Sequence, residues 1–302
     1  MRVSIWNGSY ITYADDSNLY WESPADTMND TLKTAGEVLS KVATYCSDNC
    51  LRLNESKCKY VFIGTRPAIR KLNTMDLIDL KINNIPMERL THAKVLGITI
   101  DEVMSWRRQV NLCVSKAMCN FFQMSRYKRF LNEEAKIKLC ESIVLSQFNY
   151  CDVVYSNLDI FLKEKIQKIQ NLCIKFIFNL RRKDHCDYKL LRKNLKWLDM
   201  NQRRVKHGLT LIYKILHGLA PHYLSDSFTL VNQIHNVNTR RARNNDIWIN
   251  KQAKSKLHQK SYTVEMAKIY NDIPEDIKKS SSVICFKKRI GDLLFNDNLA
   301  FP

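Results

Sequence analysis

The sequence predicts an α+β fold, in which a small antiparallel sheet with one covering helix precedes a mostly α-helical remainder. Two observations support this fold class. Short runs of β-favouring residues occupy positions 9–101, and apolar residues recur every three or four positions after Ser105. A chain of 302 residues can bury at least one sizeable core, and two subdomains are plausible.

The first predicted element is a β-hairpin over residues 9–21. Tyr, Ile, Thr and Trp favour a half-buried pleated surface, and here they flank a tight turn made by Ala14, Asp15 and Asp16. Two neighbouring carboxylates repel each other unless a cation lies between them, so one interpretation of the turn is a divalent-metal site. The other is an ordinary acidic surface turn, which the dipeptide alone does not exclude.

A helix is expected after the hairpin, over residues 27–50. Ser23, Pro24 and Asp26 favour a helix start. Apolar residues then recur on one helical face, at Met28, Leu32, Ala35, Leu39, Val42 and Cys46. We interpret this stripe as core that lies against the sheet holding the hairpin.

Three further β segments complete the first part. Residues 57–63 form a predicted strand, and residues 78–87 form a predicted second hairpin around an Asn-Asn turn. Residues 93–100 form another predicted strand, with Gly97 at a point where the backbone must bend or be closely approached.

The remainder is predicted to be helical. In residues 158–180 the apolar positions alternate four and three apart, over too few heptads for a coiled coil, so intramolecular packing is the better interpretation. Residues 218–257 are mixed and polar and break any long period. The expected helices are 105–129, 133–148, 158–180, 199–217, 259–271 and 283–295.

The charge distribution points to a polyanionic partner. The chain holds 48 Lys and Arg against 30 Asp and Glu, a formal net charge of +18. Residues 1–103 hold 12 basic and 13 acidic side chains, whereas residues 104–302 hold 36 and 17, so the helical part carries all the excess. Nucleic acid is the leading candidate, and an acidic membrane surface is the weaker one because no basic amphipathic helix with a clean apolar face stands out.

Composition also bounds the compartment. No apolar run approaches the roughly 20 residues that cross a bilayer, and the first residues turn polar too early for a secretory signal. Ten Cys without such a signal suggest reduced thiols and an intracellular protein, in the nucleus or the cytoplasm. Cys46, Cys50 and Cys58 are close in sequence, but zinc sites usually contain C-x-x-C pairs and the chain has none.

Several motifs, in order, resemble the reverse transcriptase of non-LTR (LINE-type, jockey-like) retrotransposons. Tyr13-Ala14-Asp15-Asp16 between hydrophobic strands is similar to the metal-binding hairpin of that family. The stretch from Leu53 to Phe62 is similar to its "N-x-x-K-t" segment, and the stretch from Lys94 to Asp101 to its "LG-x-x-x-D" primer grip. Trp106 then lies where such elements usually carry a Trp. The agreement of order and approximate spacing is more specific than any single motif.

The resemblance implies two-metal nucleotidyl transfer. Asp15 and Asp16 would bind Mg²⁺ or Mn²⁺ in a site where two ions lie about 3.5–4 Å apart. Lys57 matches the family Lys that protonates the pyrophosphate leaving group, although a Lys in this position is also consistent with a solvated or phosphate-facing side chain. Leu96 and Gly97 match the primer grip, where a bare Gly backbone lets a primer strand approach, or they are an ordinary strand segment.

The resemblance also implies a domain order. Residues 1–103 correspond to part of a palm-type sheet, 104–195 to a helical thumb, and 196–302 to a C-terminal region without assignable chemistry. An RNA template and a DNA primer are the implied partners, with another protein encoded by the same element as a further one. The predicted nucleic-acid contacts after the primer grip are Arg107, Arg108, Arg126, Tyr127, Lys128 and Arg129, and Phe130 beside them can stack on bases.

The chain departs from the family at its start. The family has a third metal-binding Asp and a nucleotide-contact motif on a preceding segment, and no Asp precedes Asp15 here. We therefore expect an N-terminally truncated reverse transcriptase that is inactive, or nearly so, by itself, because Mg²⁺ requires near-octahedral oxygen ligation. Two alternatives stay open: a non-catalytic basic helical protein that binds RNA or DNA, and a helical interaction module whose charge only solubilises it.

Overall fold

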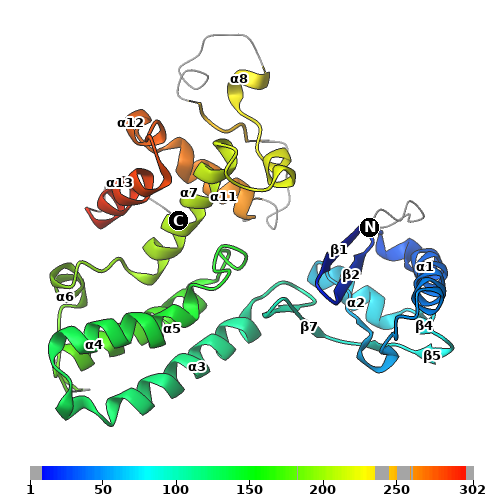
Figure 1. Ribbon diagram of the computed structural model, residues 1–302, viewed down its shortest axis with the longest axis horizontal. Coiled ribbons are helices and arrows are strands. Elements are labelled where there is room, and N and C mark those ends of the chain that lie inside the picture. The colour runs from blue at the N-terminus through cyan, green and yellow to red at the C-terminus, as the bar shows by residue number, and fades with distance from the viewer. Residues whose placement is uncertain (1–8, 182, 235–244, 250–258, 260, 297–302) are drawn as a thin grey trace. The chain divides into compact units, whose positions relative to one another are not determined.

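The computed structural model describes residues 9–181, 183–234, 245–249, 259 and 261–296. Over these residues the protein is mostly helical with four small two-stranded sheets, which confirms an α+β class with a helical majority. The chain divides into two compact units, one ending at Gln109 and the other beginning at Val110 (Figure 1). Within the described residues, no helix combines the length and apolar character that a membrane crossing needs.

The first unit holds short strands around two helices. Its elements are β1 (Ser9–Tyr13), β2 (Asp16–Tyr20), η1 (Ala25–Thr27), α1 (Met28–Asp48), η2 (Glu55–Lys57), β3 (Lys59–Tyr60), α2 (Arg66–Thr74), β4 (Lys81–Ile82), β5 (Ile85–Pro86), β6 (Glu88–Arg89), β7 (His92–Val95) and β8 (Ile98–Asp101). The sequence predicted one small antiparallel sheet, but the strands do not join into a single sheet. They form four separate pairs, of which β1–β2, β4–β5 and β7–β8 are antiparallel and β3–β6 is parallel.

The core of the first unit lies under α1. The predicted apolar stripe is confirmed, because Leu32, Ala35 and Leu39 are buried. They pack with Phe62 and with side chains of α2 and β4, and Leu19 and Trp21 from the hairpin region are partly buried against the same cluster. The hairpin is therefore attached to the core through the end of β2, while its tip extends away from the core.

The sequence did not predict helix α2. Thr65 caps α2 by accepting a hydrogen bond from the Ala68 backbone N–H, and Pro67 occupies its first turn, where a missing N–H costs nothing. The preceding strand β3 is shorter than the sequence predicted. Residues 55–57 form the turn η2, and only Lys59 and Tyr60 of the predicted strand 57–63 pair with β6.

The second unit is a set of packed helices (Figure 1). In chain order, and counting α3 from its start in the first unit, its elements are α3 (Arg107–Ser125), η3 (Lys128–Phe130), α4 (Glu133–Leu139), the π-helical turn η4 (Cys140–Val144), η5 (Leu145–Phe148), α5 (Ile160–Ile177), α6 (Tyr188–Asn194), α7 (Met200–Leu216), η6 (His222–Ser227), α8 (Val231–Ile234), α11 (Tyr262–Asn271), α12 (Glu275–Lys278) and α13 (Val283–Phe295). The six helical segments expected from periodicity are all present, and among the described residues the helices α6, α8 and α12 are additional.

Two apolar clusters hold these helices. In the first, Phe121 of α3 meets Phe176 of α5 edge-on, with ring centroids 5.6 Å apart. In the second, buried side chains of α7, α11 and α13 pack together. Helix α7 starts at a capping box formed by Asp199 and Gln202, and the Gln202 side chain also donates to the Leu294 carbonyl oxygen at 2.9 Å.

Candidate metal and nucleic-acid sites

The hairpin with the two carboxylates is present as the sequence predicted. β1 and β2 pair in register from Ser9 opposite Tyr20 to Tyr13 opposite Asp16, which leaves a two-residue turn of Ala14 and Asp15. Ala14 has φ 53°, in the left-handed region that tight hairpin turns use. Asp15 therefore lies in the turn itself and Asp16 is the first residue of β2.

Both carboxylates face solvent. Asp15 and Asp16 are exposed, and neither side chain has a hydrogen-bond or ion-pair partner among the described residues. Oxygen ligands of this kind suit Mg²⁺ or Mn²⁺, which proteins commonly hold through one or two carboxylates together with substrate phosphates. Within the described ranges no group of three or more His, Cys, Asp or Glu is placed to hold a metal ion, so the two Asp supply only part of a coordination sphere.

The prediction that Lys57 begins a strand over residues 57–63 was wrong. Lys57 is the last residue of the 3₁₀ turn η2 and is exposed. Two side-chain hydrogen bonds stabilise the turn, since Ser56 Oγ donates to Asn54 Oδ1 at 2.7 Å and Asn83 donates to the Glu55 carboxylate at 2.9 Å.

Leu96 and Gly97 form a turn instead of the middle of one strand. β7 and β8 pair up to Val95 opposite Ile98, so the predicted strand 93–100 is a hairpin. Leu96 and Gly97 have φ 46° and 87°, the two positive values that a type I′ hairpin turn requires. Leu96 is exposed at the tip, and Gly97 provides the bare backbone that the sequence predicted, at a turn.

Arg107 and Arg108 are exposed at the start of α3. The Asp101 carboxylate accepts hydrogen bonds from the backbone N–H groups of Ser105 and Trp106, each at 3.1 Å, and Trp106 is buried. The Asp of the "LG-x-x-x-D" motif therefore fixes the entry into α3, where the two Arg side chains begin the basic part of the chain.

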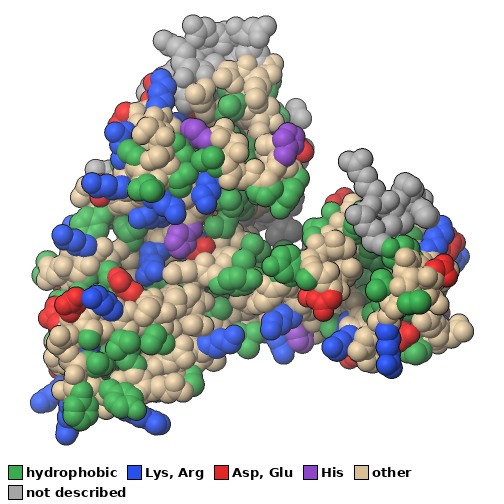
Figure 2. Space-filling view, in the orientation of Figure 1, with side chains coloured by type: hydrophobic (Ala, Val, Ile, Leu, Met, Phe, Trp, Pro, Cys, Tyr) green, Lys and Arg blue, Asp and Glu red, His purple; other side chains and the backbone are tan. Residues whose placement is uncertain are grey.

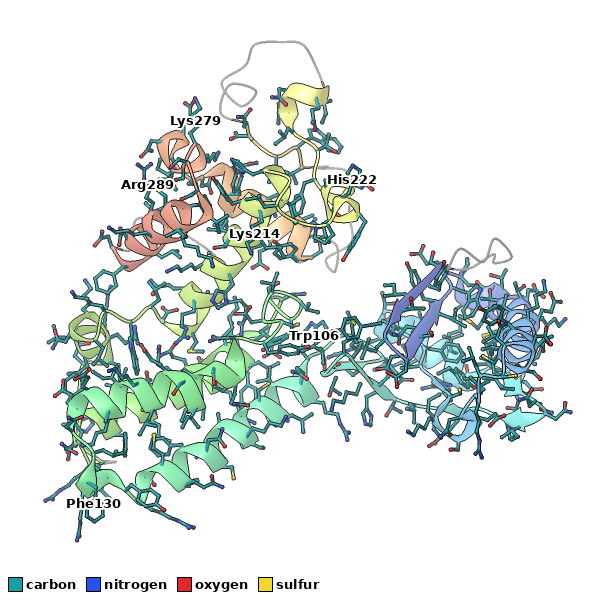
Figure 3. The ribbon with its side chains drawn as sticks, viewed as in Figure 1. Trp106, Phe130, Lys214, His222, Lys279 and Arg289 are labelled. Carbon is teal, nitrogen blue, oxygen red and sulfur yellow. The ribbon has the colours of Figure 1, made fainter. Side chains whose placement is uncertain are left out.

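Four predicted nucleic-acid contacts lie together at the turn between α3 and α4. Arg126, Tyr127 and Arg129 are exposed and Lys128 is half-buried. Phe130 follows them with 85% of its surface exposed, the largest fraction among the exposed large hydrophobic side chains. We call residues 126–130 the α3–α4 tip. Figure 2 shows Lys and Arg side chains around hydrophobic ones in the corner of the second unit where Figure 3 labels Phe130.

The sequence holds four further short basic runs, at 181–183, 203–204, 240–243 and 287–289, and the described ones differ in exposure. Lys287, Lys288 and Arg289 are exposed on α13, as a phosphate-binding surface requires. The pair Arg203-Arg204 is not such a surface, because Arg204 is buried with its guanidinium 5.5 Å from the centre of the Tyr155 ring, and burial lowers the pKa of both Arg. The cluster at 240–243 and residue 182 lie outside the described residues.

Sequence reasoning missed a set of long-range polar contacts in the second unit. The Lys136 ammonium donates to Asn179 Oδ1 at 2.8 Å, His207 Nδ1 lies 2.6 Å from Asp152 Oδ2, and Lys278 pairs with Asp246. Each contact joins residues more than 30 positions apart, so periodicity gives no signal for them. Lys136 and Lys278 are buried and bonded inside the fold, so their charges are not available to a polyanion.

Comparison with known proteins offers no template for these sites. No family model matches the chain, and neither a curated protein nor a solved structure matches it. A function has to be inferred from the chain's own residues and from the family resemblance of its motifs.

Proposed function

We propose that this chain is a piece of the RNA-directed DNA polymerase of a non-LTR retrotransposon. The supporting observation is the pair of adjacent, unpartnered carboxylates at the exposed tip of the β1–β2 hairpin. It occurs in a chain whose residues 104–302 carry 36 basic and 17 acidic side chains. Nucleotidyl transfer on nucleic acid needs both a cation site and a polyanion-binding segment, and one chain carries candidates for both.

In this proposal Asp15 and Asp16 hold Mg²⁺ or Mn²⁺. Two solvent-facing carboxylates in adjacent positions repel each other, and a divalent cation removes that repulsion. When bound, the ion would stabilise charge on the phosphates and lower the pKa of an attacking hydroxyl. The chain's own contribution is to hold Asp15 in the two-residue turn and Asp16 at the start of β2, in a hairpin that is attached to the core through Leu19 and Trp21.

The remaining predicted residues have roles in binding the template and primer. Gly97 at the β7–β8 turn presents backbone without a side chain, so a nucleic-acid strand can approach it closely. Lys57, exposed on η2, is placed to meet a phosphate. On this assignment residues 1–103 are the palm part, 104–195 the thumb, and the RNA template and DNA primer are intracellular partners.

We expect little polymerase activity from the chain alone. Two carboxylates leave most of the coordination sphere of a pair of Mg²⁺ ions to other groups. The alternative function, a non-catalytic nucleic-acid-binding protein derived from such an element, is favoured by the exposed basic residues of the α3–α4 tip. Both functions use the same nucleic-acid-binding surface. They differ in the hairpin, because only the polymerase needs a metal ion at Asp15 and Asp16.

The test measures ion binding and nucleic-acid binding separately. Mn²⁺ binding to the full chain, followed by electron paramagnetic resonance, should weaken strongly in Asp15→Asn and Asp16→Asn. Asp48→Asn is the matched control, since Asp48 is an exposed carboxylate at the end of α1. Unchanged Mn²⁺ affinity in Asp15→Asn would contradict the metal site.

Nucleic-acid binding is measured with a template–primer duplex at several salt concentrations. Affinity should fall with salt, with a log–log slope of about −0.9 for each phosphate neutralised. If the chain binds the duplex without salt dependence, or does not bind it, both nucleic-acid functions fail. The helical interaction module would then be the remaining function. If the unmodified chain extends a primer and Asp15→Asn abolishes the extension, the chain is a polymerase that is active alone. If the unmodified chain binds Mn²⁺ but extends no primer, the result supports the proposal.

A further inference from the structure

The α3–α4 tip exposes more aromatic surface than its packing explains. Phe130 is 85% exposed, Tyr127 62%, and Phe122, one turn back on α3, 58%. A single exposed aromatic side chain is ordinary on a protein surface, but three within nine positions form a local apolar patch, and such patches mark contact sites.

These rings point outward because the opposite face of α3 is used for packing. Phe121 and Met124 are buried, and the Phe121 ring meets Phe176 of α5. Lys136 of α4 is buried beside the same ring, with its Nζ 5.6 Å from the Phe176 centroid. The turn between α3 and α4 is thus attached to the core from one side only, and its other side is unpartnered among the described residues.

The backbone of the turn places Tyr127 and Phe130 on one side. The Tyr127 N–H donates to the Met124 carbonyl oxygen at 3.0 Å, and the Phe130 N–H donates to the Tyr127 carbonyl oxygen at 2.9 Å. In such 3₁₀ geometry, side chains at positions i and i+3 are eclipsed. Asn132 then caps α4 by accepting from the Ala135 N–H at 2.8 Å. The backbone that carries the two rings is therefore ordered before any ligand arrives, which reduces the entropy lost on binding.

Cations surround the two rings. Arg126 and Arg129 are exposed and Lys128 is half-buried. The nearest acids begin α4, and of these Glu134 is paired with Lys138, whose Nζ lies 2.7 Å from its Oε1. The tip thus combines exposed rings with adjacent positive charge (Figures 2 and 3).

We propose that the α3–α4 tip binds unpaired nucleotides, with the rings of Tyr127 and Phe130 stacking on bases and the neighbouring Arg and Lys contacting phosphates. This inference rests on the proposed nucleic-acid function and narrows it to a substrate class. Bases in a duplex are stacked on each other and offer no free face to a protruding ring, whereas a single strand does. The tip therefore favours a single-stranded segment over a duplex.

A membrane surface is the other ligand that aromatic and basic residues suit, and it is an outcome of the test. The observations favour nucleic acid because the rings occupy one tight turn and not the long apolar face of an interfacial helix.

The experiment uses the full chain and fluorescence anisotropy with two probes, an unstructured oligothymidylate and a blunt DNA duplex of the same length. Tyr127→Leu and Phe130→Leu keep apolar bulk but remove the stacking face. Phe161→Leu is the matched control, because Phe161 on α5 is also 62% exposed. Each tip variant should weaken oligothymidylate binding roughly 5- to 150-fold, the range expected for one lost stack, and change duplex binding less than about twofold.

The remaining variants and probes separate the explanations. Arg129→Gln should weaken both probes to a similar extent, because phosphate contacts do not depend on unpaired bases. Equal weakening of both probes by Phe130→Leu, or no weakening of either, would overturn the inference. Loss of binding to phosphatidylserine vesicles in Phe130→Leu, with oligothymidylate binding intact, would assign the tip to a membrane instead. If the unmodified chain binds neither probe, the proposed function itself fails.

Discussion

The buried ion pair between Lys278 and Asp246 provides a strong test of how the second unit is held together. Lys278 Nζ lies 2.8 Å from Asp246 Oδ1, and the two side chains are 3% and 8% exposed. Lys278 also donates to the Asn271 carbonyl oxygen at 3.1 Å and lies 5.1 Å from the centre of the Tyr270 ring. Asp246 precedes Ile247, whose backbone N–H and carbonyl both bond the Asn271 side chain.

The expected cost of breaking this pair follows from its burial. Asp246→Leu leaves the ammonium of Lys278 in the interior with only a carbonyl and a ring as partners. Removing one partner of a buried pair costs about 3–5 kcal/mol, because a desolvated charge is left uncompensated. For a unit of this size, each kcal/mol lowers Tm by about 2–4 °C, so we expect a fall of roughly 6–20 °C.

The measurement is thermal and urea unfolding followed by Trp fluorescence. The double variant Asp246→Leu with Lys278→Met removes both charges and should recover most of the loss, since an apolar pair of similar volume is often neutral or stabilising. Glu275→Gln is the control, because Glu275 and Lys279 form an exposed pair one helical turn apart, and its removal should cost less than about 0.5 kcal/mol. The reasoning is refuted if Asp246→Leu costs no more than Glu275→Gln.

Two further predictions concern other buried groups. Arg204 is buried, its Nε has no hydrogen-bond partner among the described atoms, and burial lowers its pKa, so Arg204→Met should leave stability unchanged or raise it by about 1–4 kcal/mol. Nucleic-acid affinity should also be unchanged, and a loss as large as that of Arg129→Gln would contradict the burial. The hydrogen bond of Cys173 with Cys140, together with burial, raises the pKa of the Cys173 thiol, which reduces its thiolate fraction at neutral pH. In timed labelling with iodoacetamide and peptide mass spectrometry, exposed Cys119 should react at once and Cys173 only as the chain unfolds; equal rates would argue against this packing.

Local signals predicted many of the elements well. The β1–β2 hairpin follows from β-favouring residues around an Ala-Asp-Asp turn, and the structure confirms the hairpin. The turn at Asn83 and Asn84 is also confirmed, since Asn tolerates the positive φ values of 50° and 65° found there. The long helices follow from the spacing of their buried residues. These features depend on neighbours within a few positions, so a sequence contains what is needed to predict them.

Local signals failed where one residue has two uses. Gly97 fits a bend in one strand as well as the turn between two strands. For the candidate sites, the sequence predicted the two Asp at the hairpin and the basic tip. It did not distinguish exposed cations such as Arg129 from a buried one such as Arg204, because both belong to short basic runs.

The sequence by itself determined the position of the acidic turn, the helical periods and the concentration of positive charge after residue 103. Only the tertiary structure decided which charges face solvent. Arg204, Lys136 and Lys278 are buried by helices distant in sequence, while Tyr127 and Phe130 stay exposed because α3 packs through its other face. The physical reason is that exposure depends on which surfaces meet when the helices pack, and those contacts join residues that no local pattern relates.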